Sequence, residues 1–347
     1  MSFVGGDLPT VCCKPRSGFL LRIVFLSPLF FCSPISPAWC SNQADLTAAV
    51  FAQQVDKNGQ DYYADVHPYL DEPLKQIVSL IPELKAIQTA PNQQELPTIL
   101  EKTGKQVDEF LRNVVNVIAQ EKITQEILNT KGAAVPGEDV ISRADVQDSY
   151  LILRHGNDVP GDVVEYRMDA KGNRLDQVGL SQGYVVTAGF ALSSIILSTA
   201  RQTDSVFREL GQEKISKRNT YVLAFAQIPS RTNPTSNLNG LKRTVQVLVQ
   251  GIVWIDKDNF QIIKLRTDLL APRPDIGLAR LTTDVTFGEA RIQDLVTPLW
   301  LPNDVKVYVD LSSKHRFRNE HHYTHYRLYR VSVKVGRTFP TRTCNGT

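Results

Sequence analysis

Three histidines stand within five residues near the C-terminal end of the chain, in the sequence His321-His322-Tyr323-Thr324-His325. Imidazole nitrogens bind zinc, so this cluster is the clearest candidate for a metal site. The flanking residues predict a strand, on which His321 and His325 share a face but lie about 13 Å apart, at roughly 3.3 Å per residue. His322 then points to the other face. We therefore expect no metal site and interpret the cluster as structural or surface residues.

Other patterns with catalytic or ligand-binding chemistry are incomplete. Asp56–Asp61 resembles a calcium-binding loop, but its glycine comes too early and His67 occupies the position of the glutamate that closes such a loop. No serine lies in a Gly-x-Ser-x-Gly turn, and the glycines between 179 and 189 do not match a phosphate-binding loop. We therefore predict no catalytic residue, no cofactor and no enzyme activity. An exported hydrolase with a dispersed acid and base stays as an alternative.

The N-terminus has the order of a secretory signal peptide. Basic residues as far as Arg22 are followed by the apolar run Ile23–Cys32 and then by the small residues of Ser36-Pro37-Ala38. We predict a signal peptide at 1–38 and a mature chain that begins near Trp39. The protein is expected to be exported and to lie in the periplasm or at the outer membrane. An uncleaved N-terminal anchor is the alternative.

Cleavage at that point leaves two of the five cysteines, Cys40 and Cys344. In an exported chain, two cysteines can form a disulfide, and these two can equally be unpaired residues near the chain ends. Cys40 also lies near the cleavage point, where lipoproteins carry their lipid. Trp39 disfavours that modification, because the preceding position requires a small residue. At the level of the sequence both alternatives stay open.

The composition is that of a soluble globular chain of 347 residues, with 42% hydrophobic and 22% charged residues, so a sizeable core is available. Basic residues are concentrated between Lys306 and Arg342, where Asp310 and Glu320 are the only acidic residues. On strands, such a run is typical of a solvated face. The alternative is a surface that binds anionic headgroups or an acidic partner. Nucleic acid is not an expected partner, because the exported chain lacks a recognition motif.

Residues 39–120 are predicted to be helical. A first helix follows Asp71, and its apolar stripe consists of Leu74, Ile77, Val78 and Ile81. A second helix begins near Glu95, and its stripe consists of Leu100, Thr103, Val107, Phe110, Leu111, Val114 and Ile118. We interpret both stripes as surfaces that face the core. The segment 131–143 contains glycine, proline and acidic residues, which predicts a loop.

Between about 121 and 340 the pattern changes to the period of two that is typical of strands. Predicted strands cover Asp148–His155, Glu165–Asp169, Thr220–Gln227, Val305–Leu311 and 329–335. The separators are short, as in the turns at 171–173 and 256–259, which favours antiparallel neighbours over parallel crossovers. A helical region followed by an antiparallel meander predicts the α+β class, with the helices and the sheet in one domain.

The segment Thr244–Asp256 is the most informative of these strands. Valine and glutamine alternate as far as Gln250, and Ile252–Ile255 is then apolar on both faces. A strand with one wet face does not have this pattern, so apolar groups are expected above and below this end of the strand. The pattern indicates a sheet with a core on one side and an apolar hollow on the other.

The same region carries a family resemblance. Gly251–Asp256 followed by Ile262–Leu265 resembles the strand-turn-strand of the LolA/LppX-like outer-membrane lipoprotein carrier fold. Further segments resemble a group of exported bacterial proteins, namely Ile81–Leu84, Phe110–Asn113, Thr282–Gly288, Leu299–Pro302 and Asn319–Arg327. The resemblance implies a curved antiparallel sheet, an incomplete β-barrel, that wraps around the N-terminal helices on its concave side. It also implies an apolar interior able to hold the acyl chains of a lipid or lipoprotein.

These interpretations lead to a hypothesis about function. We expect an envelope protein that binds or carries a lipid or another hydrophobic ligand in the hollow of the half-barrel. One alternative is a non-catalytic structural or interaction module of the cell envelope, with an envelope protein as its partner.

The expected lining of the hollow comes from Trp254 and Ile252, with Phe225, Tyr221 and Trp300 as neighbours from other strands. Trp254 and Ile252 are predicted to face one way, and Val253 and Ile255 the other. The alternative role for all of these residues is to fill a compact core, as aromatic side chains commonly do.

Overall fold

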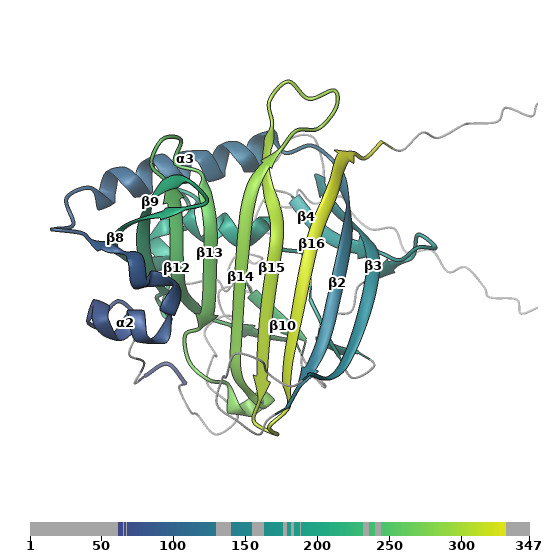
Figure 1. Cartoon of the computed structure of the whole chain (residues 1–347), viewed down its shortest axis with the longest axis horizontal. Helices are drawn as coiled ribbons and strands as arrows, with labels where there is room; N and C mark the ends of the chain where they lie inside the picture. The colour runs from purple at the N-terminus through teal and green to yellow at the C-terminus, as the bar shows by residue number, and fades with distance from the viewer. Residues whose placement is uncertain are drawn as a thin grey trace, which may run out of the picture. The chain divides into compact units, whose positions relative to one another are not determined.

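The computed structural model describes residues 62–64, 66, 68–129, 140–154, 163–175, 179–181, 184–187, 189–231, 236–239 and 244–330. The predicted signal peptide, Cys40, Cys344 and most of the strand expected at 329–335 lie outside these residues. Within them, one large antiparallel sheet is accompanied by two small sheets and a few helices. Figure 1 shows the strands of the large sheet side by side, with the long helix α3 (Leu96–Asn113) across one end of them.

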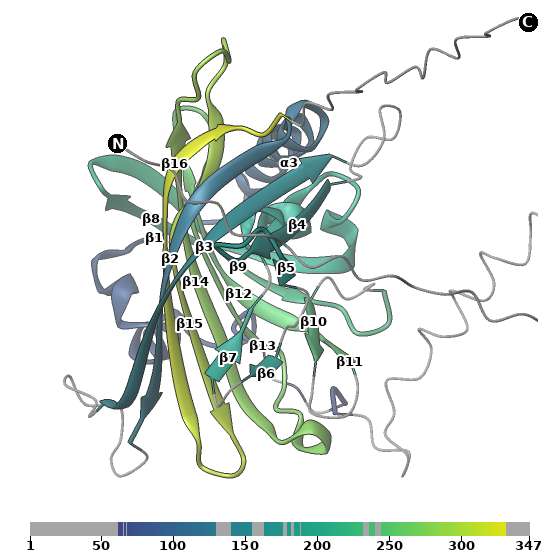
Figure 2. The ribbon, with the colours of Figure 1, turned by 90° about the vertical axis from the view of Figure 1, so that its right-hand side faces the viewer.

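The large sheet has 12 antiparallel strands in the spatial order β1-β8-β9-β12-β13-β14-β15-β16-β2-β3-β4-β5. Their bounds are β1 Gln88–Thr89, β2 Val117–Leu128, β3 Val140–Arg154, β4 Val163–Met168, β5 Arg174–Leu175, β8 Ser205–Ile215, β9 Arg218–Gln227, β12 Val249–Asp256, β13 Ile262–Leu269, β14 Leu278–Ala290, β15 Leu299–Leu311 and β16 Arg316–Leu328. Among the described strands β1 and β5 are the two edges and do not pair, so the sheet is open. The predicted α+β fold with a curved, incompletely closed antiparallel sheet is confirmed (Figure 2).

Two small sheets and several short helices accompany the large sheet. The small sheets are the hairpins β6 (Gly179–Ser181) with β7 (Tyr184–Val186) and β10 (Ser236–Asn239) with β11 (Thr244–Val247). The short helices are α2 (Leu74–Leu80) and the 3-10 turns η1 (Pro82–Ala86), η2 (Ala191–Leu197), η3 (Gln202–Asp204) and η4 (Pro274–Ile276). The described helices include none that is both long enough and apolar enough to cross a membrane.

The strand β12 is buried on both faces, as the sequence predicts. Val253 and Ile255 point to the inner, concave face of the sheet and belong to the main core. Ile252 and Trp254 point to the outer face and belong to a second cluster. The neighbouring strand β9 has the same two-sided character, because each of its faces contributes to one of the two clusters. Each of the two apolar faces of β9 and β12 must therefore be covered by another part of the chain.

The two helices cover opposite faces, which corrects the expectation that both pack on the concave side. Ile99 and Val107 of α3 belong to the main core on the inner face. Ile77 of α2 and Ile81 just after it belong to the outer cluster, together with Trp254. The physical reason is the two-sided apolar pattern of β9 and β12, because burying the outer side chains also removes apolar surface from water.

Several predicted boundaries are wrong, each for a local reason. The second helix ends at Asn113, and β2 begins at Val117, so the helical region does not reach 120. The β-branched residues Val114, Val115, Val117 and Ile118 favour a strand over a helix. The predicted loop at 131–143 is too long, because β3 already begins at Val140. The strand expected at 244–256 is two strands, since Leu248 separates β11 from β12.

The backbone comes unusually close to itself at Gly251. A Cβ atom at this position would lie 1.9 Å from the carbonyl oxygen of Arg266 and 2.9 Å from the ring of Phe225. Only glycine fits here, because any side chain would push apart strands that pair on both sides of β12. The glycine inside the motif Gly251–Asp256 is thus required by the packing of β9 against β12 and β13.

Candidate ligand-binding site

The structure divides the five predicted lining residues between the two faces of the sheet. Trp254 and Ile252 are fully buried on the outer face, beneath α2. Phe225 and Tyr221 of β9 and Trp300 of β15 belong to the core of the inner face. Trp254 and Ile252 therefore do not face the inside of the curved sheet, and they are not neighbours of the other three. Only Phe225, Tyr221 and Trp300 lie on the inner face of the sheet, where the hollow was expected.

The concave side of the sheet is covered by other parts of the same chain. Helix α3 contacts η2, and η2 in turn contacts β13. The short strand β7 lies against β2 and β16. In Figure 2, the short strands β6, β7, β10 and β11 lie on the side of the large sheet toward which it curves. The inner side chains of the central strands are buried as a result, including Val285, Val305 and Val307.

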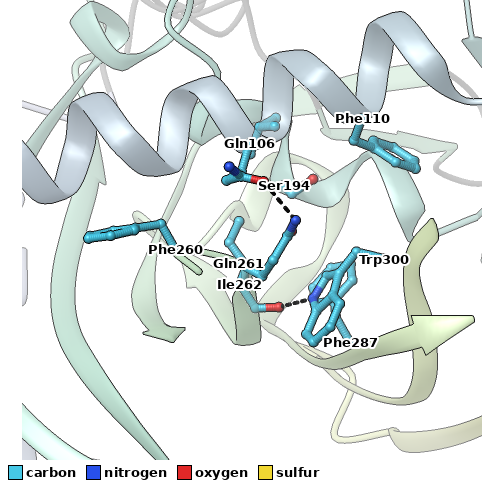
Figure 3. A pocket seen from close by; sticks show the side chains of 9 residues that line it. Gln106, Phe110, Ser194, Phe260, Gln261, Ile262, Phe287 and Trp300 are labelled. Carbon is cyan, nitrogen blue, oxygen red and sulfur yellow. Dashed lines mark hydrogen bonds between the residues drawn. The ribbon is translucent and has the colours of Figure 1, made fainter. Parts of the chain in front are cut away.

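A small cavity lies where α3 meets the sheet (Figure 3). Its volume is about 20 Å³, which is room for about one water molecule. The lining consists of Gln106, Val107 and Phe110 from α3, Ser194 from η2, Phe260 and Gln261 from the turn after β12, and Ile262, Phe287 and Trp300 from β13, β14 and β15. The larger side chains are apolar, so the site suits an apolar group.

Trp300 is held in a defined position at this cavity. Its indole Nε1 donates a hydrogen bond to the carbonyl oxygen of Ile262 at 2.6 Å. The guanidinium of Arg218 lies 5.4 Å from the centre of the Trp300 ring. A fixed, half-buried aromatic ring next to Phe110 and Phe287 is a suitable wall for an aliphatic chain, because it loses little conformational freedom when a ligand binds.

Helix α3 is attached to the rest of the fold by packing and by few polar contacts. Gln261 donates to the side chain of Gln106 at 2.9 Å, and Gln202 donates to the carbonyl oxygen of Leu100 at 2.7 Å. Asp108 accepts a hydrogen bond from the backbone N–H of Thr199 at 3.3 Å. None of these three contacts is a salt bridge, so displacing α3 breaks neutral or exposed hydrogen bonds and exposes apolar surface.

A cluster of charged residues lies buried on the same inner face, away from this cavity. The Arg167 guanidinium on β4 donates two hydrogen bonds to the Glu121 carboxylate on β2, one of them at 2.7 Å. His321 on β16 lies beside both, with its Nδ1 2.8 Å from the Glu121 carboxylate. Burial raises the pKa of Glu121, but Arg167 and His321 outweigh this effect and bring it down to about 2. The carboxylate is therefore ionised at neutral pH.

This cluster fastens the segment that covers the concave face. Arg167 donates a further hydrogen bond to the carbonyl oxygen of Thr187, just after β7. The Thr187 hydroxyl lies 3.4 Å from the Nε2 atom of His321. Glu121, Arg167 and His321 thus each have a polar partner, as buried polar groups require. The contacts are those of a structural clamp, and the described residues include no group of His, Cys, Asp or Glu side chains that could hold a metal ion.

A second buried carboxylate holds the start of η2. Glu165 on β4 accepts hydrogen bonds from the backbone N–H groups of Ala191 at 2.6 Å and Leu192 at 3.3 Å. The Tyr150 hydroxyl on β3 donates to the same carboxylate. Burial raises the pKa of Glu165, and these hydrogen bonds work in the opposite direction. The covering segment is therefore attached at two points, at Thr187 and at Ala191.

The three histidines do not converge. His321 is buried in the clamp, whereas His322 is exposed and lies 2.6 Å from the carboxylate of Asp304. The predicted opposition of His321 and His322 is confirmed. The prediction that His325 shares a face with His321 is wrong, because the pairing of β16 with β2 shifts after Thr324. His325 has a positive φ of 55° and an exposed side chain, so the bulge turns it outward.

Sequence reasoning missed Glu121, Arg167 and Glu165, which position the covering segment. Glu121 stands at the predicted boundary between the helical region and the sheet, and Glu165 and Arg167 lie in the predicted strand Glu165–Asp169, to which no function is assigned. Their only signal is the period of two, which assigns Glu121 to the same face of β2 as the buried Ile123. A charged residue at an inward position predicts a buried ion pair, but its partner lies on another strand.

No protein-family model and no curated protein matches the chain. The solved structures that are similar to it include the following three. A proposed outer membrane lipoprotein-sorting protein domain from Vibrio parahaemolyticus is 14% identical, with a TM-score of 0.32, and the match covers 66% of this chain and 91% of that one.

The other two structures have comparable scores. A DUF1329 family protein from Desulfovibrio piger is 11% identical, with a TM-score of 0.36, and the match covers 69% of this chain and 94% of that one. A LolA superfamily protein from Nitrosomonas europaea is 14% identical, with a TM-score of 0.28, and the match covers 67% and 94% of the two chains.

Proposed function

We propose that this protein binds the apolar part of a lipid or another hydrophobic ligand between α3 and the inner face of the sheet. The observation that carries this proposal is the aromatic and aliphatic lining at the joint of α3 with β13, β14 and β15. This joint is closed by side-chain packing and a few neutral hydrogen bonds. A ligand that replaces these contacts with its own apolar surface offsets the cost of moving the helix.

The cavity as it stands is too small for an acyl chain, so binding requires α3 to move. Each buried CH₂ group of the ligand contributes about 0.8 kcal/mol. A chain of many such groups therefore supplies enough free energy to displace a helix held mainly by Ile99, Val107 and Phe110. Ligand binding selects an open state in which the aromatic side chains at the joint contact the ligand.

The proposed lining differs from the one expected from the sequence. Trp300 keeps its role and is joined by Phe110 and Phe287, which line the same cavity. Phe225 and Tyr221 support the inner core nearby. Trp254 and Ile252 are assigned to the packing of α2 on the outer face. We propose no catalytic residue, because the buried carboxylates Glu121 and Glu165 are occupied by structural contacts.

The proposal includes a place and a class of partner. The apolar segment Ile23–Cys32, with the small residues after it, supports export to the periplasm or to the outer membrane. In that compartment the ligands of suitable chemistry are membrane lipids and the acyl chains of lipoproteins.

Titration of the delipidated mature protein with a fluorescent fatty-acid analogue tests the proposal. We expect saturable binding that Phe110→Ala weakens about tenfold or more, because a buried aromatic side chain contributes roughly 1.5–3 kcal/mol. Glu109→Ala, an exposed neighbour in the same helix, is the matched control and leaves the affinity unchanged. Trp254→Phe alters the outer face and also leaves it unchanged. Equal effects of Phe110→Ala and Trp254→Phe would rule out the joint as the binding site.

A second candidate function is supported by the small volume of the cavity. A filled interior suits a non-catalytic structural or interaction module of the cell envelope, which needs a rigid sheet and no ligand. Native mass spectrometry of protein purified from its own envelope separates the two candidates. A bound lipid that organic extraction removes favours the carrier, whereas protein without lipid, together with no saturable binding of the fatty-acid analogue, favours the envelope module.

A further inference from the structure

The run of basic residues near the C-terminal end has a structural counterpart at one end of the sheet. An open hollow of about 470 Å³ lies where β2 begins and β16 ends. Its lining consists of Ile118 from β2, Gln293 and Asp294 from the β14–β15 loop, and Arg327, Leu328, Tyr329 and Arg330 at the end of β16. The hollow shares no lining residue with the cavity under α3.

The hollow combines an apolar part with a basic part. Ile118 is buried and Leu328 is half-buried against the main core, so they form an apolar surface within the hollow. Arg327 is exposed, and no described carboxylate pairs with it. Arg330 is also exposed and contacts Asp294 at 3.3 Å. Of the two arginines in the hollow, one is thus free to bind an anion from outside the chain.

Two more arginines lie near the same end of the sheet. The backbone N–H of Arg154, at the end of β3, donates to the Asn116 side chain at 2.8 Å, and the N–H of Tyr329 donates to the Asn116 carbonyl at 2.8 Å. Arg154 also donates through Nη1 to the carbonyl oxygen of Arg112, at the end of α3, at 2.5 Å. These contacts connect the end of α3 with the ends of β3 and β16.

The arginines at this end carry an uncompensated positive charge. Neither Arg112 nor Arg154 forms an ion pair with a carboxylate in the described part of the chain, and the same holds for Arg327. A guanidinium with unused donors binds phosphate well, because its fork of N–H groups matches two phosphate oxygens.

We propose that this end of the sheet binds the phosphate headgroup of an anionic phospholipid at a membrane surface, with Arg327 on the phosphate and Ile118 and Leu328 against the first carbons of the acyl chains. The juxtaposition of an unpaired arginine with an apolar surface favours an amphiphile over a free anion, which needs no apolar contact. This inference goes beyond ligand binding under α3 and does not depend on it.

Co-sedimentation of the mature full chain with lipid vesicles tests the proposal. We expect binding to phosphatidylcholine vesicles that contain phosphatidylglycerol and little binding to pure phosphatidylcholine. Salt weakens the interaction, because it screens the charges. Arg327→Gln lowers the affinity about fivefold, which corresponds to the contribution of about 1 kcal/mol per basic residue near an anionic membrane. Arg327→Glu lowers it further.

Lys314→Glu is the matched control for Arg327→Glu. Lys314 lies in the turn between β15 and β16, at the other end of these strands, and is exposed. Lys314→Glu changes the net charge by the same amount as Arg327→Glu. A general charge effect would therefore weaken binding equally in both variants, and that result would overturn the proposal. Leu328→Asn tests the apolar contact and is expected to weaken vesicle binding in a protein whose thermal unfolding is shown to be cooperative.

Soluble glycerol phosphate distinguishes a lipid site from a site for a free phosphate. We expect it to compete only weakly with the vesicles, because it lacks the acyl chains. Tight saturable binding of glycerol phosphate without vesicle binding would overturn the lipid assignment, and absence of both would overturn the site. The fatty-acid titration is unaffected by Arg327→Glu in either case, so the failure of this proposal is distinguishable from failure of ligand binding under α3.

Discussion

His321 and Glu121 are 200 residues apart in the sequence, yet the Nδ1 atom of His321 lies 2.8 Å from the Glu121 carboxylate. The imidazole donates to a carboxylate that Arg167 already neutralises. Asp148 on β3 lies close enough to Glu121 and Arg167 for both to influence its pKa, and Tyr323 lies next to His321 on β16. A proton added to His321 would place a second cation beside Arg167 in a buried site.

The stability of the protein is therefore expected to fall as the pH is lowered below about 6.5, the ordinary pKa of histidine. Burial lowers the pKa of His321 in the folded protein. The unfolded chain then takes up the proton first, so protonation favours unfolding from pH 6.5 downward until the folded pKa is reached. Each pH unit in this window costs up to about 1.4 kcal/mol. Urea unfolding at pH 7.5 and pH 5.5 measures the loss.

His321→Gln is expected to remove this loss, because glutamine keeps a hydrogen-bond donor for Glu121 and does not titrate. His322→Gln changes the exposed neighbour and serves as the control that retains the wild-type pH dependence. If His321→Gln and His322→Gln show the same pH dependence as the wild type, the clamp does not respond to acid in this range.

Glu121→Gln is expected to destabilise the protein by about 3–5 kcal/mol, because it leaves the buried Arg167 charge without its partner. Thermal unfolding monitored by circular dichroism gives the change. The double variant Glu121→Leu with Arg167→Met removes both charges and is expected to lose less stability than the single variant. Asp145→Asn, in an exposed pair with Arg143, should give no measurable change. A single variant as stable as the wild type would mean that Arg167 finds another partner.

Ile77→Ala in α2 is expected to cost about 2–5 kcal/mol, the range for a large-to-small change in a core. Ile77 is fully buried against the cluster that contains Trp254 on the outer face. Leu80→Ala in the same helix is the control, because Leu80 is exposed, and its effect should be much smaller. Equal effects would show that α2 does not cover the outer face in solution. Urea unfolding of the two variants provides the comparison.

The protein is expected to bind no stoichiometric zinc or nickel at the histidine cluster. His321 is occupied by Glu121, and the bulge after Thr324 turns His325 away from it. Metal analysis of protein dialysed against zinc and nickel measures the content. A stoichiometric ion that is lost when His321 and His325 are replaced together would contradict this expectation.

Much of the fold could be predicted from local patterns. The turns at 171–173 and 256–259, the strands around 220–227 and 305–311, and the antiparallel class all follow from periods and turn residues that lie within a few positions of each other. The two-sided burial of Ile252–Ile255 also follows, because a strand with no polar face has to be covered twice.

Which element covers which face could not be predicted in the same way. The apolar stripes of α2 and α3 are equivalent as patterns, and either could pack on either side of the sheet. The choice depends on where the chain enters the sheet, and the short strand β1 places α2 outside before α3 crosses to the inside. The five residues expected to line one hollow lie on two faces of the sheet. Trp254 on β12 points to the outer face, whereas Phe225 on the neighbouring strand β9 points to the inner face.

By itself, the sequence determined the class of fold, the positions of several strands and the identity of residues that must be buried, because these depend on local spacing and hydrophobicity. The tertiary structure alone decided the partners of buried charges. Glu121, Arg167 and His321 come from three strands that are distant in the sequence and adjacent in the sheet. A buried charge is stable only next to its counter-charge, and that neighbour is set by strand order rather than by any local pattern.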